Sequence, residues 1–186
     1  MEVRLPAQSL SDDEKQWFVM RDLKRANAVC PAYKMLIGMG VRVYTPLHWK
    51  IIEERGRRVR RQIPFLRDLL FVYDTKPALD VIVRKTPTLQ YRYVRGSYCC
   101  PMTVPGDDMQ RFIHAVDTSC NPRFYLPEEI HPSMIGKEVR IVGGQLDGYE
   151  GHLLSIRGSR SKRLIINLPT MISACVEVSS EYIQFL

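Results

Sequence analysis

The chain has 186 residues, of which 45% are hydrophobic and 25% are charged, and its formal net charge is +7. This length fits one medium domain or two small ones, and this apolar fraction excludes a globally disordered chain. No segment approaches the roughly 18 consecutive apolar residues of a membrane span. The N-terminal segment contains Asp12, Asp13 and Glu14 rather than the apolar centre of a signal peptide. These features predict a cytoplasmic protein that does not associate with membranes.

Positive charge is concentrated in the first part of the chain. Residues 1–119 contain 20 Lys and Arg against 13 Asp and Glu, whereas residues 120–186 contain 7 of each. Contacts with nucleic acid are therefore expected in the first part. The neutral second part is better suited to a protein partner than to a phosphate backbone.

The five cysteines indicate neither a disulfide framework nor a zinc site, because they are odd in number and form no CxxC pair. Cys99 and Cys100 with the distant His114 offer a nucleophile and a base, but their loop has no signature of an oxyanion hole or a helix start. We therefore expect unreactive or buried thiols, no metal, no cofactor and no enzymatic activity.

The spacing of apolar residues predicts alternating strands and helices over the first part of the chain. In chain order they are a strand (17–20), a helix (26–37), a strand (41–45), two hairpin arms (49–52 and 59–63), a buried strand (69–73), a helix (79–85), a strand (91–94) and a helix (105–116).

Residues 120–134 contain proline and charge without periodicity, which predicts a linker. After the linker, short apolar runs separated by turns predict a small β-barrel. The expected fold class is α+β: an antiparallel sheet with flanking helices over residues 15–119, then a small barrel over residues 135–186.

Gly143, Gly144, Gly148 and Gly151 separate two of the barrel strands. Glycines at this density require positive φ angles or very close backbone approaches. A phosphate-binding loop is excluded because a strand, not a helix, follows them. This segment consists of a strand, a turn that contains Leu146 and a second strand. It resembles the KOW motif, the signature hairpin of SH3-like barrels in transcription elongation and ribosomal proteins.

Nearly the whole chain, from Trp17 to Leu186, resembles the NusG family of transcription elongation factors. The matching segments follow one another in the same order as in that family. That family joins a ferredoxin-like N-terminal (NGN) domain to a KOW barrel. One departure is Arg67-Asp68-Leu69, which replaces the Pro-Gly-Tyr of the family. The matching segments are Trp17–Met20, Val43–Pro46, Pro64–Val72, Gly96–Pro101 with Val104–Pro105, and Ile135–Ile141 with Gly151.

The resemblance implies a monomeric, non-enzymatic factor that binds the clamp helices of RNA polymerase through residues 15–119 and suppresses pausing or termination. The run Arg163–Leu168 resembles the specialised RfaH and UpxY paralogues, and UpxY-type proteins are antiterminators of capsular polysaccharide operons. The resemblance also implies that the barrel binds a ribosomal protein or a termination factor. Its β-branched residues favour strands over the helical hairpin that some relatives form.

The hairpin between residues 50 and 61 has a local net charge of +4. Guanidinium groups there are suited to the phosphates of single-stranded non-template DNA in the transcription bubble, or of the upstream duplex. A solvated hairpin tip is the alternative. The candidate nucleic-acid-binding residues are Arg55, Arg57, Arg58, Arg60 and Arg61.

Protein interfaces are anchored by aromatic and large apolar side chains. The family resemblance places the polymerase contact near the start of the buried strand, where we expect Leu70 and Val72 to face the core. The candidate polymerase-binding residues are Tyr44, Phe65, Leu66 and Leu69.

In the barrel we expect the glycines to serve turn geometry and to hold Leu146 and Tyr149 outward, toward a partner. The alternative function is a KOW-type RNA-binding or ribosome-associated module, which predicts a basic barrel and is disfavoured by the neutral charge count. The candidate turn and partner surface is Gly144, Leu146, Gly148, Tyr149 and Gly151.

Overall fold

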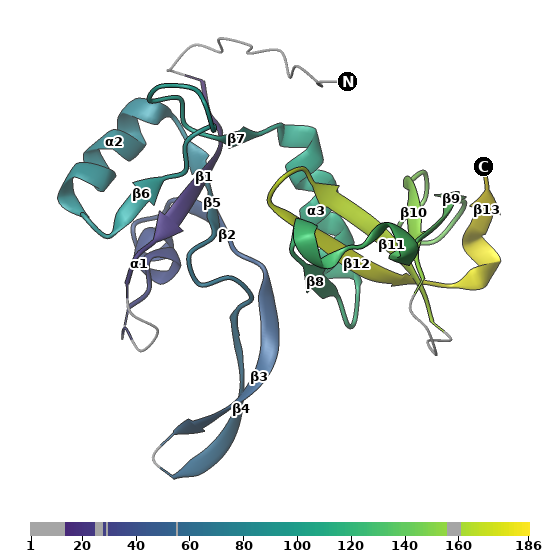
Figure 1. The fold of residues 1–186 in the computed structure, drawn as a ribbon. Coiled ribbons are helices and arrows are strands. Elements are labelled where there is room, and N and C mark those ends of the chain that lie inside the picture. The colour runs from purple at the N-terminus through teal and green to yellow at the C-terminus, as the bar shows by residue number, and fades with distance from the viewer. Residues whose placement is uncertain (1–13, 25–27, 29, 55, 156–160) are drawn as a thin grey trace. The chain divides into compact units, whose positions relative to one another are not determined.

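A computed structural model describes residues 14–24, 28, 30–54, 56–155 and 161–186. The chain forms two compact units, Met1–Pro105 and Gly106–Leu186. Each contains antiparallel sheets and at least one helix, which confirms the predicted α+β class (Figure 1). No helix in the described ranges is long and apolar enough to cross a membrane.

The first unit is built on a five-stranded antiparallel sheet in the order β2-β5-β1-β6, with β7 also paired to β1. The central strands β1 and β5 carry the longest apolar runs, and they pair with Trp17 opposite Tyr73 and Met20 opposite Leu70. The elements of this unit are β1 (Gln16–Asp22), α1 (Ala32–Gly38), β2 (Arg42–Tyr44), β3 (Leu47–Glu54), β4 (Arg57–Pro64), β5 (Leu70–Asp74), α2 (Lys76–Lys85), β6 (Leu89–Tyr91) and β7 (Thr103–Val104).

Helices α1 and α2 pack on one face of this sheet. The Asp22 carboxylate at the end of β1 accepts a hydrogen bond of 2.6 Å from the Ala32 amide, which places the start of α1. Helix α1 is shorter than expected, and Ala26 and Val29 lie outside the described residues. The core on this face confirms the prediction for Leu70 and Val72; its buried members are Phe18, Met20, Ala32, Leu36, Leu70, Val72, Leu79, Leu89 and Tyr91.

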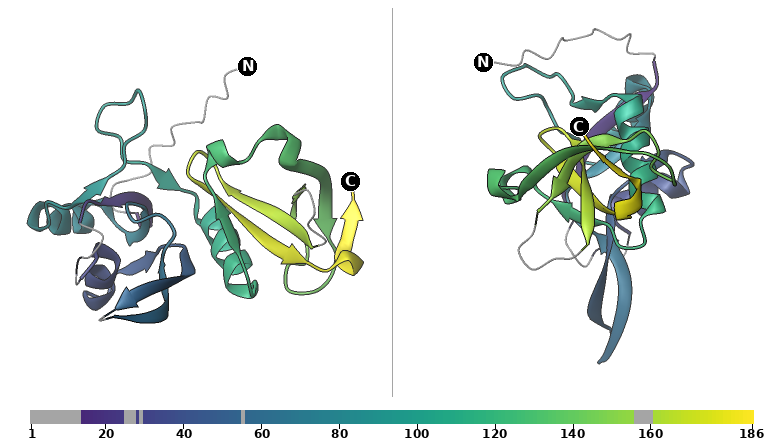
Figure 2. Two further views of the ribbon diagram at one scale, coloured as in Figure 1. Left: turned by 60° about the horizontal axis from the view of Figure 1, so that its bottom comes forward. Right: turned by 90° about the vertical axis from the view of Figure 1, so that its right-hand side faces the viewer.

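Strands β3 and β4 form a separate two-stranded sheet. Their pairing is unbroken from Leu47 opposite Pro64 to Glu54 opposite Arg57, so the hairpin is longer than the predicted arms. Figures 1 and 2 show it extending away from the five-stranded sheet of its own unit. Gly56, with φ at +73°, provides the left-handed conformation that its tight turn requires.

The second unit contains a six-stranded sheet in the order β13-β9-β10-β11-β12-β8. The last strand, β13, returns through a 3-10 turn to pair with β9, as in a small SH3-like barrel. The elements are α3 (Gly106–Thr118), β8 (Arg123–Tyr125), η1 (Pro127–Glu129), η2 (Pro132–Met134), β9 (Ile135–Ile141), β10 (Glu150–Leu154), β11 (Lys162–Leu168), β12 (Ile172–Val178), η3 (Ser180–Tyr182) and β13 (Ile183–Phe185).

The division between the units corrects the predicted boundaries of 119 and 134. Helix α3 packs against β11 and β12 and belongs to the barrel unit (Figure 2). Residues 120–134 are not a linker, because β8 pairs with β12, and Ile130 and Met134 pack on the barrel core. The buried side chain of Arg163 also donates a 2.9 Å hydrogen bond to the Asn121 carbonyl.

Candidate interaction sites

The β3–β4 hairpin has two faces with different chemistry. Residues directly opposite each other in an antiparallel pair point to the same side, and the side alternates along the strand. Opposite pairs therefore place Trp49 with Gln62, Ile51 with Arg60 and Glu53 with Arg58 on one face. We call this the Trp49 face. The other, the Lys50 face, carries Lys50, Ile52, Glu54, Arg57, Val59 and Arg61.

The four described candidate arginines, Arg57, Arg58, Arg60 and Arg61, are all exposed. Arg61 forms an ion pair with Glu54 on the Lys50 face. Arg60 lies over the ring of Trp49, with its guanidinium carbon 4.6 Å from the ring centroid. Arg55 lies outside the described residues. The candidate arginines therefore divide between the two faces of the hairpin.

The predicted polymerase-binding residues gather where the hairpin joins the sheet. Tyr44, at the end of β2, is paired with Phe71, and their ring centroids are 6.4 Å apart. The amide of Phe65 donates a 2.8 Å hydrogen bond to the Pro46 carbonyl, which connects the two ends of the hairpin. Tyr44, Phe65 and Leu66 are half-buried, as a surface anchor would be.

Leu69 does not belong to this exposed set, contrary to the prediction. Its side chain is only 1% exposed, so it is buried and contributes nothing to an exposed surface. The carbonyl of Leu69 accepts a 3.1 Å hydrogen bond from the Thr45 hydroxyl, and its amide donates to the Leu66 carbonyl. Leu69 thus holds the turn in place, and the candidate patch reduces to Tyr44, Phe65 and Leu66.

Asp68, in the turn before β5, forms two ion pairs. One of its carboxylate oxygens lies 3.2 Å from a guanidinium nitrogen of Arg92 and 3.5 Å from one of Arg21. The turn is therefore joined to β1 and to the segment after β6 by ion pairs. Sequence reasoning did not find these partners, since both arginines are distant along the chain.

His48 packs edge-on against Phe65 at the base of the hairpin, with ring centroids 5.7 Å apart and an interplanar angle of 78°. Burial lowers the pKa of His48, and the positive charge of Lys50 lowers it further. The imidazole is accordingly neutral near pH 7 and acts there as an aromatic packing group.

The barrel glycines have the structural roles expected of them. Gly144 and Gly148 have φ angles of +72° and +77°, which side chains rarely adopt. Gly151 is needed for a different reason: a Cβ there would lie 3.0 Å from the Ile165 carbonyl oxygen of the next strand. The turn is closed by reciprocal backbone hydrogen bonds of 2.8 Å between Ile141 and the segment Gly148–Tyr149.

The expectation that Leu146 and Tyr149 point outward to a partner is wrong. They are only 8% and 9% exposed. The Tyr149 ring packs against α3, where its hydroxyl lies 3.0 Å from Nδ1 of His114 and donates to the Arg111 carbonyl at 3.2 Å. Burial raises the pKa of Tyr149, although the charge of Arg111 opposes this shift. The turn therefore contacts the helix of its own unit.

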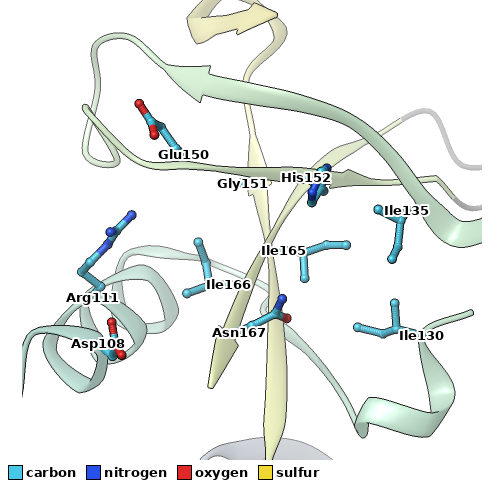
Figure 3. Close-up of a pocket in the computed structure, with 10 residues that line it drawn as sticks. All are labelled: Asp108, Arg111, Ile130, Ile135, Glu150, Gly151, His152, Ile165, Ile166 and Asn167. Carbon is cyan, nitrogen blue, oxygen red and sulfur yellow. The ribbon is translucent and has the colours of Figure 1, made fainter. Parts of the chain in front are cut away.

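A hollow of about 270 Å³ lies beside α3 and the barrel strands. Figure 3 shows isoleucines within it and polar groups from α3, β10 and β11 around them. Glu150, at its edge, is paired with Arg140 at 2.8 Å. In the parts of the chain that the structure describes, no three His, Cys, Asp or Glu side chains are close enough to hold a metal ion. The lining residues are Asp108, Arg111, Ile130, Ile135, Glu150, Gly151, His152, Ile165, Ile166 and Asn167.

The cysteines likewise offer no candidate catalytic thiol. Cys30, Cys99, Cys100 and Cys120 are exposed thiols, and Cys175 is buried in the barrel. Burial raises the pKa of the Cys175 thiol to about 12, although Arg163 and Arg123 oppose the shift. This thiol is therefore protonated at neutral pH.

Sequence reasoning missed Trp49 and Ile51 as surface residues. They are 55% and 66% exposed. Their spacing of two places both side chains on one face of a strand that pairs with the arginine-rich arm, and this spacing could have identified them.

No known protein family matches the chain, and no curated protein is similar to it in sequence. Among solved structures, a NusG protein from Thermotoga maritima, studied for its domain interaction, is similar. The match has a TM-score of 0.44 and 14% identity, and it covers 94% of this chain and 98% of that chain.

Proposed function

We propose that this protein is a transcription elongation factor of the NusG type that acts on RNA polymerase in the cytoplasm. The observation that carries the proposal is the extended β3–β4 hairpin with four exposed arginines beside the half-buried patch of Tyr44, Phe65 and Leu66. The patch is suited to the clamp helices of the polymerase, and the arginines to the phosphates of nearby DNA. The ordered sequence motifs support the same function.

The mechanism that we propose is stabilisation of the closed polymerase clamp. A ligand that binds the closed state better than the open state shifts the population toward the closed state, by its difference in affinity alone. Pausing and termination would then be suppressed without any covalent chemistry. The finer assignment, antitermination of a capsular polysaccharide operon by a UpxY-like paralogue, rests on the resemblance of Arg163–Leu168.

Charge disfavours the alternative, an RNA-binding or ribosome-associated barrel. With the boundary placed after Pro105, the first unit has a net formal charge of +9 and the second a net charge of −2. The second unit therefore lacks the net positive charge that attracts a phosphate backbone. The nucleic-acid contacts therefore belong to the first unit.

For the barrel we propose a protein partner, a ribosomal protein or a termination factor. Leu146 and Tyr149 are buried, so the contact requires other residues. Val142, directly after β9, and Phe185, which pairs with Val139 of β9, are 52% and 58% exposed. Replacing both with serine is expected to abolish capture of that partner from solution. Capture at the wild-type level would exclude this edge.

The proposal is tested by the affinity of the full chain for core RNA polymerase. Phe65→Ala removes an apolar anchor, and we expect binding to weaken by about tenfold or more. Tyr98→Ala is the matched control, because Tyr98 is an aromatic side chain of the same unit and is 97% exposed. A folded Phe65→Ala protein that binds with full affinity would exclude the patch.

A further inference from the structure

Cys99 and Cys100 place two exposed thiols on adjacent residues. No other two cysteines in the sequence are neighbours, and Cys30 and Cys120 are single exposed thiols. A nucleophile with a distant base, considered above for the same residues, does not use their adjacency. Two neighbouring thiols have a chemistry that a single thiol lacks, because they can close an S–S bond within one loop.

The pair lies at the tip of a short hairpin in the segment between β6 and β7 (Figure 2). The amide of Met102 donates a 2.7 Å hydrogen bond to the Arg92 carbonyl, and the amide of Val94 donates one of 2.9 Å to the Cys100 carbonyl. The backbone of Cys100 is thereby held at the end of the hairpin stem, whereas Cys99 belongs to the turn.

The backbone of Cys99 has an unusual conformation, with a φ angle of +50°. This left-handed conformation costs a residue with a side chain about 1–2 kcal/mol. Neighbouring side chains of an extended strand point to opposite sides, and a left-handed residue interrupts that alternation, as in a β-bulge. The conformation of Cys99 thus removes the arrangement that would keep the two sulfur atoms apart.

A disulfide between neighbouring residues is easily reduced. The Cα atoms of adjacent residues are about 3.8 Å apart, which is shorter than the roughly 4.4–6.8 Å of ordinary disulfides. The bond therefore stores strain, and strained, exposed disulfides are the ones that form and break reversibly. Such a bond is suited to a reversible modification rather than to a permanent cross-link.

We propose that Cys99 and Cys100 are a redox modification site, at which a low-molecular-weight disulfide such as oxidised glutathione forms a reversible S–S bond. One cysteine thiolate attacks a sulfur of the small disulfide, forms a mixed disulfide and releases one small thiol. The neighbouring thiolate attacks the protein sulfur of that mixed disulfide and releases the second small thiol. The two thiols of the protein lose two hydrogen atoms, which the two small thiols gain. This site does not depend on the proposed function.

Mass spectrometry of the full chain tests the proposal. The reduced protein is equilibrated with roughly millimolar oxidised glutathione at about pH 8, because the thiolate is the reacting species. Free thiols are then alkylated, and the chain is digested with trypsin, which cuts after Lys and Arg. Both cysteines fall in the peptide 96–111, whereas Cys30 and Cys120 fall in the peptides 26–34 and 112–123.

Peptide 96–111 should lose two hydrogen atoms. Its internal disulfide should exceed its glutathione adduct by about tenfold or more, because the neighbouring thiol acts at a high effective concentration. The peptides of Cys30 and Cys120 are internal controls and should carry glutathione, since no adjacent thiol displaces it. Cys100→Ser and Cys99→Ser should each turn the internal disulfide of peptide 96–111 into a glutathione adduct, and excess dithiothreitol should restore both thiols in wild type.

The same equilibration in concentrated urea measures what the hairpin contributes. An unfolded chain rarely holds Cys99 in the left-handed conformation, so the ratio of internal disulfide to glutathione adduct should fall by about threefold or more. An equal ratio in urea would overturn the role of the turn. A stable glutathione adduct on the folded wild-type peptide 96–111, or a disulfide through it that joins two chains, would overturn the proposal.

Binding to core polymerase is a separate measurement on the reduced protein. Its failure would refute the proposed function and leave the redox site standing.

Discussion

The hydroxyl of Tyr149, in the turn between β9 and β10, lies 3.0 Å from Nδ1 of His114 on α3. The same hydroxyl donates to the Arg111 carbonyl, and the Arg111 guanidinium lies 5.0 Å from the ring centroid. One side chain therefore joins the glycine-rich turn to the helix. This contact adds to the packing of α3 on β11 and β12.

Removing this hydroxyl should weaken the barrel unit. Tyr149→Phe keeps the ring but leaves His114 and the Arg111 carbonyl without their partner, at a cost of about 0.5–1.5 kcal/mol in the free energy of unfolding. Urea denaturation measures the change. Tyr182→Phe is the control, since the structure shows no hydrogen bond from that hydroxyl to a described side chain. Equal stability of wild type and Tyr149→Phe would mean that the contact contributes nothing.

Gly151→Ala should be costly because of space rather than backbone conformation. The new Cβ would lie 3.0 Å from the Ile165 carbonyl oxygen and 3.4 Å from a Leu164 methyl group. Overpacking of this kind destabilises by about 1–3 kcal/mol. Gly38→Ala, at the end of α1 with open space around it, should be neutral or slightly stabilising in the same thermal melt. Similar melting temperatures for both variants would contradict this account.

The titration of His48 gives a pH dependence with a defined sign. Its pKa is lowered in the folded protein, so between its folded pKa and about 6.5 the unfolded chain binds the proton and the folded chain does not. The contribution of neutral His48 to the free energy of unfolding is complete above about pH 6.5 and is lost as the pH falls through this window. His48→Phe should lose less stability than wild type between pH 8 and pH 5 in urea titrations. Identical losses would exclude the role of His48.

The thiol of Cys175 should react only after the barrel opens. Its raised pKa and its burial both suppress the thiolate, whereas Cys120 in the same unit is exposed. Alkylation followed by peptide mass spectrometry should modify Cys175 more slowly than Cys120, by on the order of 100-fold or more. Comparable rates in the folded protein would show that the barrel core is open to solvent.

Charge reversal on the hairpin tests its contact with DNA. Changing Arg57, Arg58, Arg60 and Arg61 to glutamate should weaken binding to an elongation complex. It should also reduce the slope of log affinity against log salt by up to about 3, if each arginine contacts one phosphate of a single strand. Reversal of the exposed Lys34, Lys85 and Arg95 of the same unit is the control. A salt slope that the hairpin changes leave unaltered would contradict the contact.

The sequence predicted the elements whose patterns are long or distinctive. The apolar runs of β5, β11 and β12 and the glycines of the barrel turn correspond to the observed structure. Strands β7 and β8 were missed because two or three residues carry no periodic signal. Their pairing is decided by distant partners rather than by local preference.

The site was only partly predictable for a related reason. The apolar face of α3 specifies that it is buried, but not which surface covers it, so the helix was assigned to the wrong unit. Leu69 ends the turn before β5 and Leu70 begins that strand, and only the folded structure shows that both are buried. The direction of Tyr149 depends on α3, which the turn sequence does not encode.

The central claim is that the first unit binds a transcribing polymerase. The most direct measurement is binding of the full chain to a reconstituted elongation complex on a template with a pause site, followed by transcript length. The account predicts saturable binding that is about tenfold or more weaker in Phe65→Ala and unchanged in Tyr98→Ala, and longer transcripts at equal time. Failure to bind the complex, with retention of free RNA or ribosomes instead, would contradict it and favour the RNA-binding alternative.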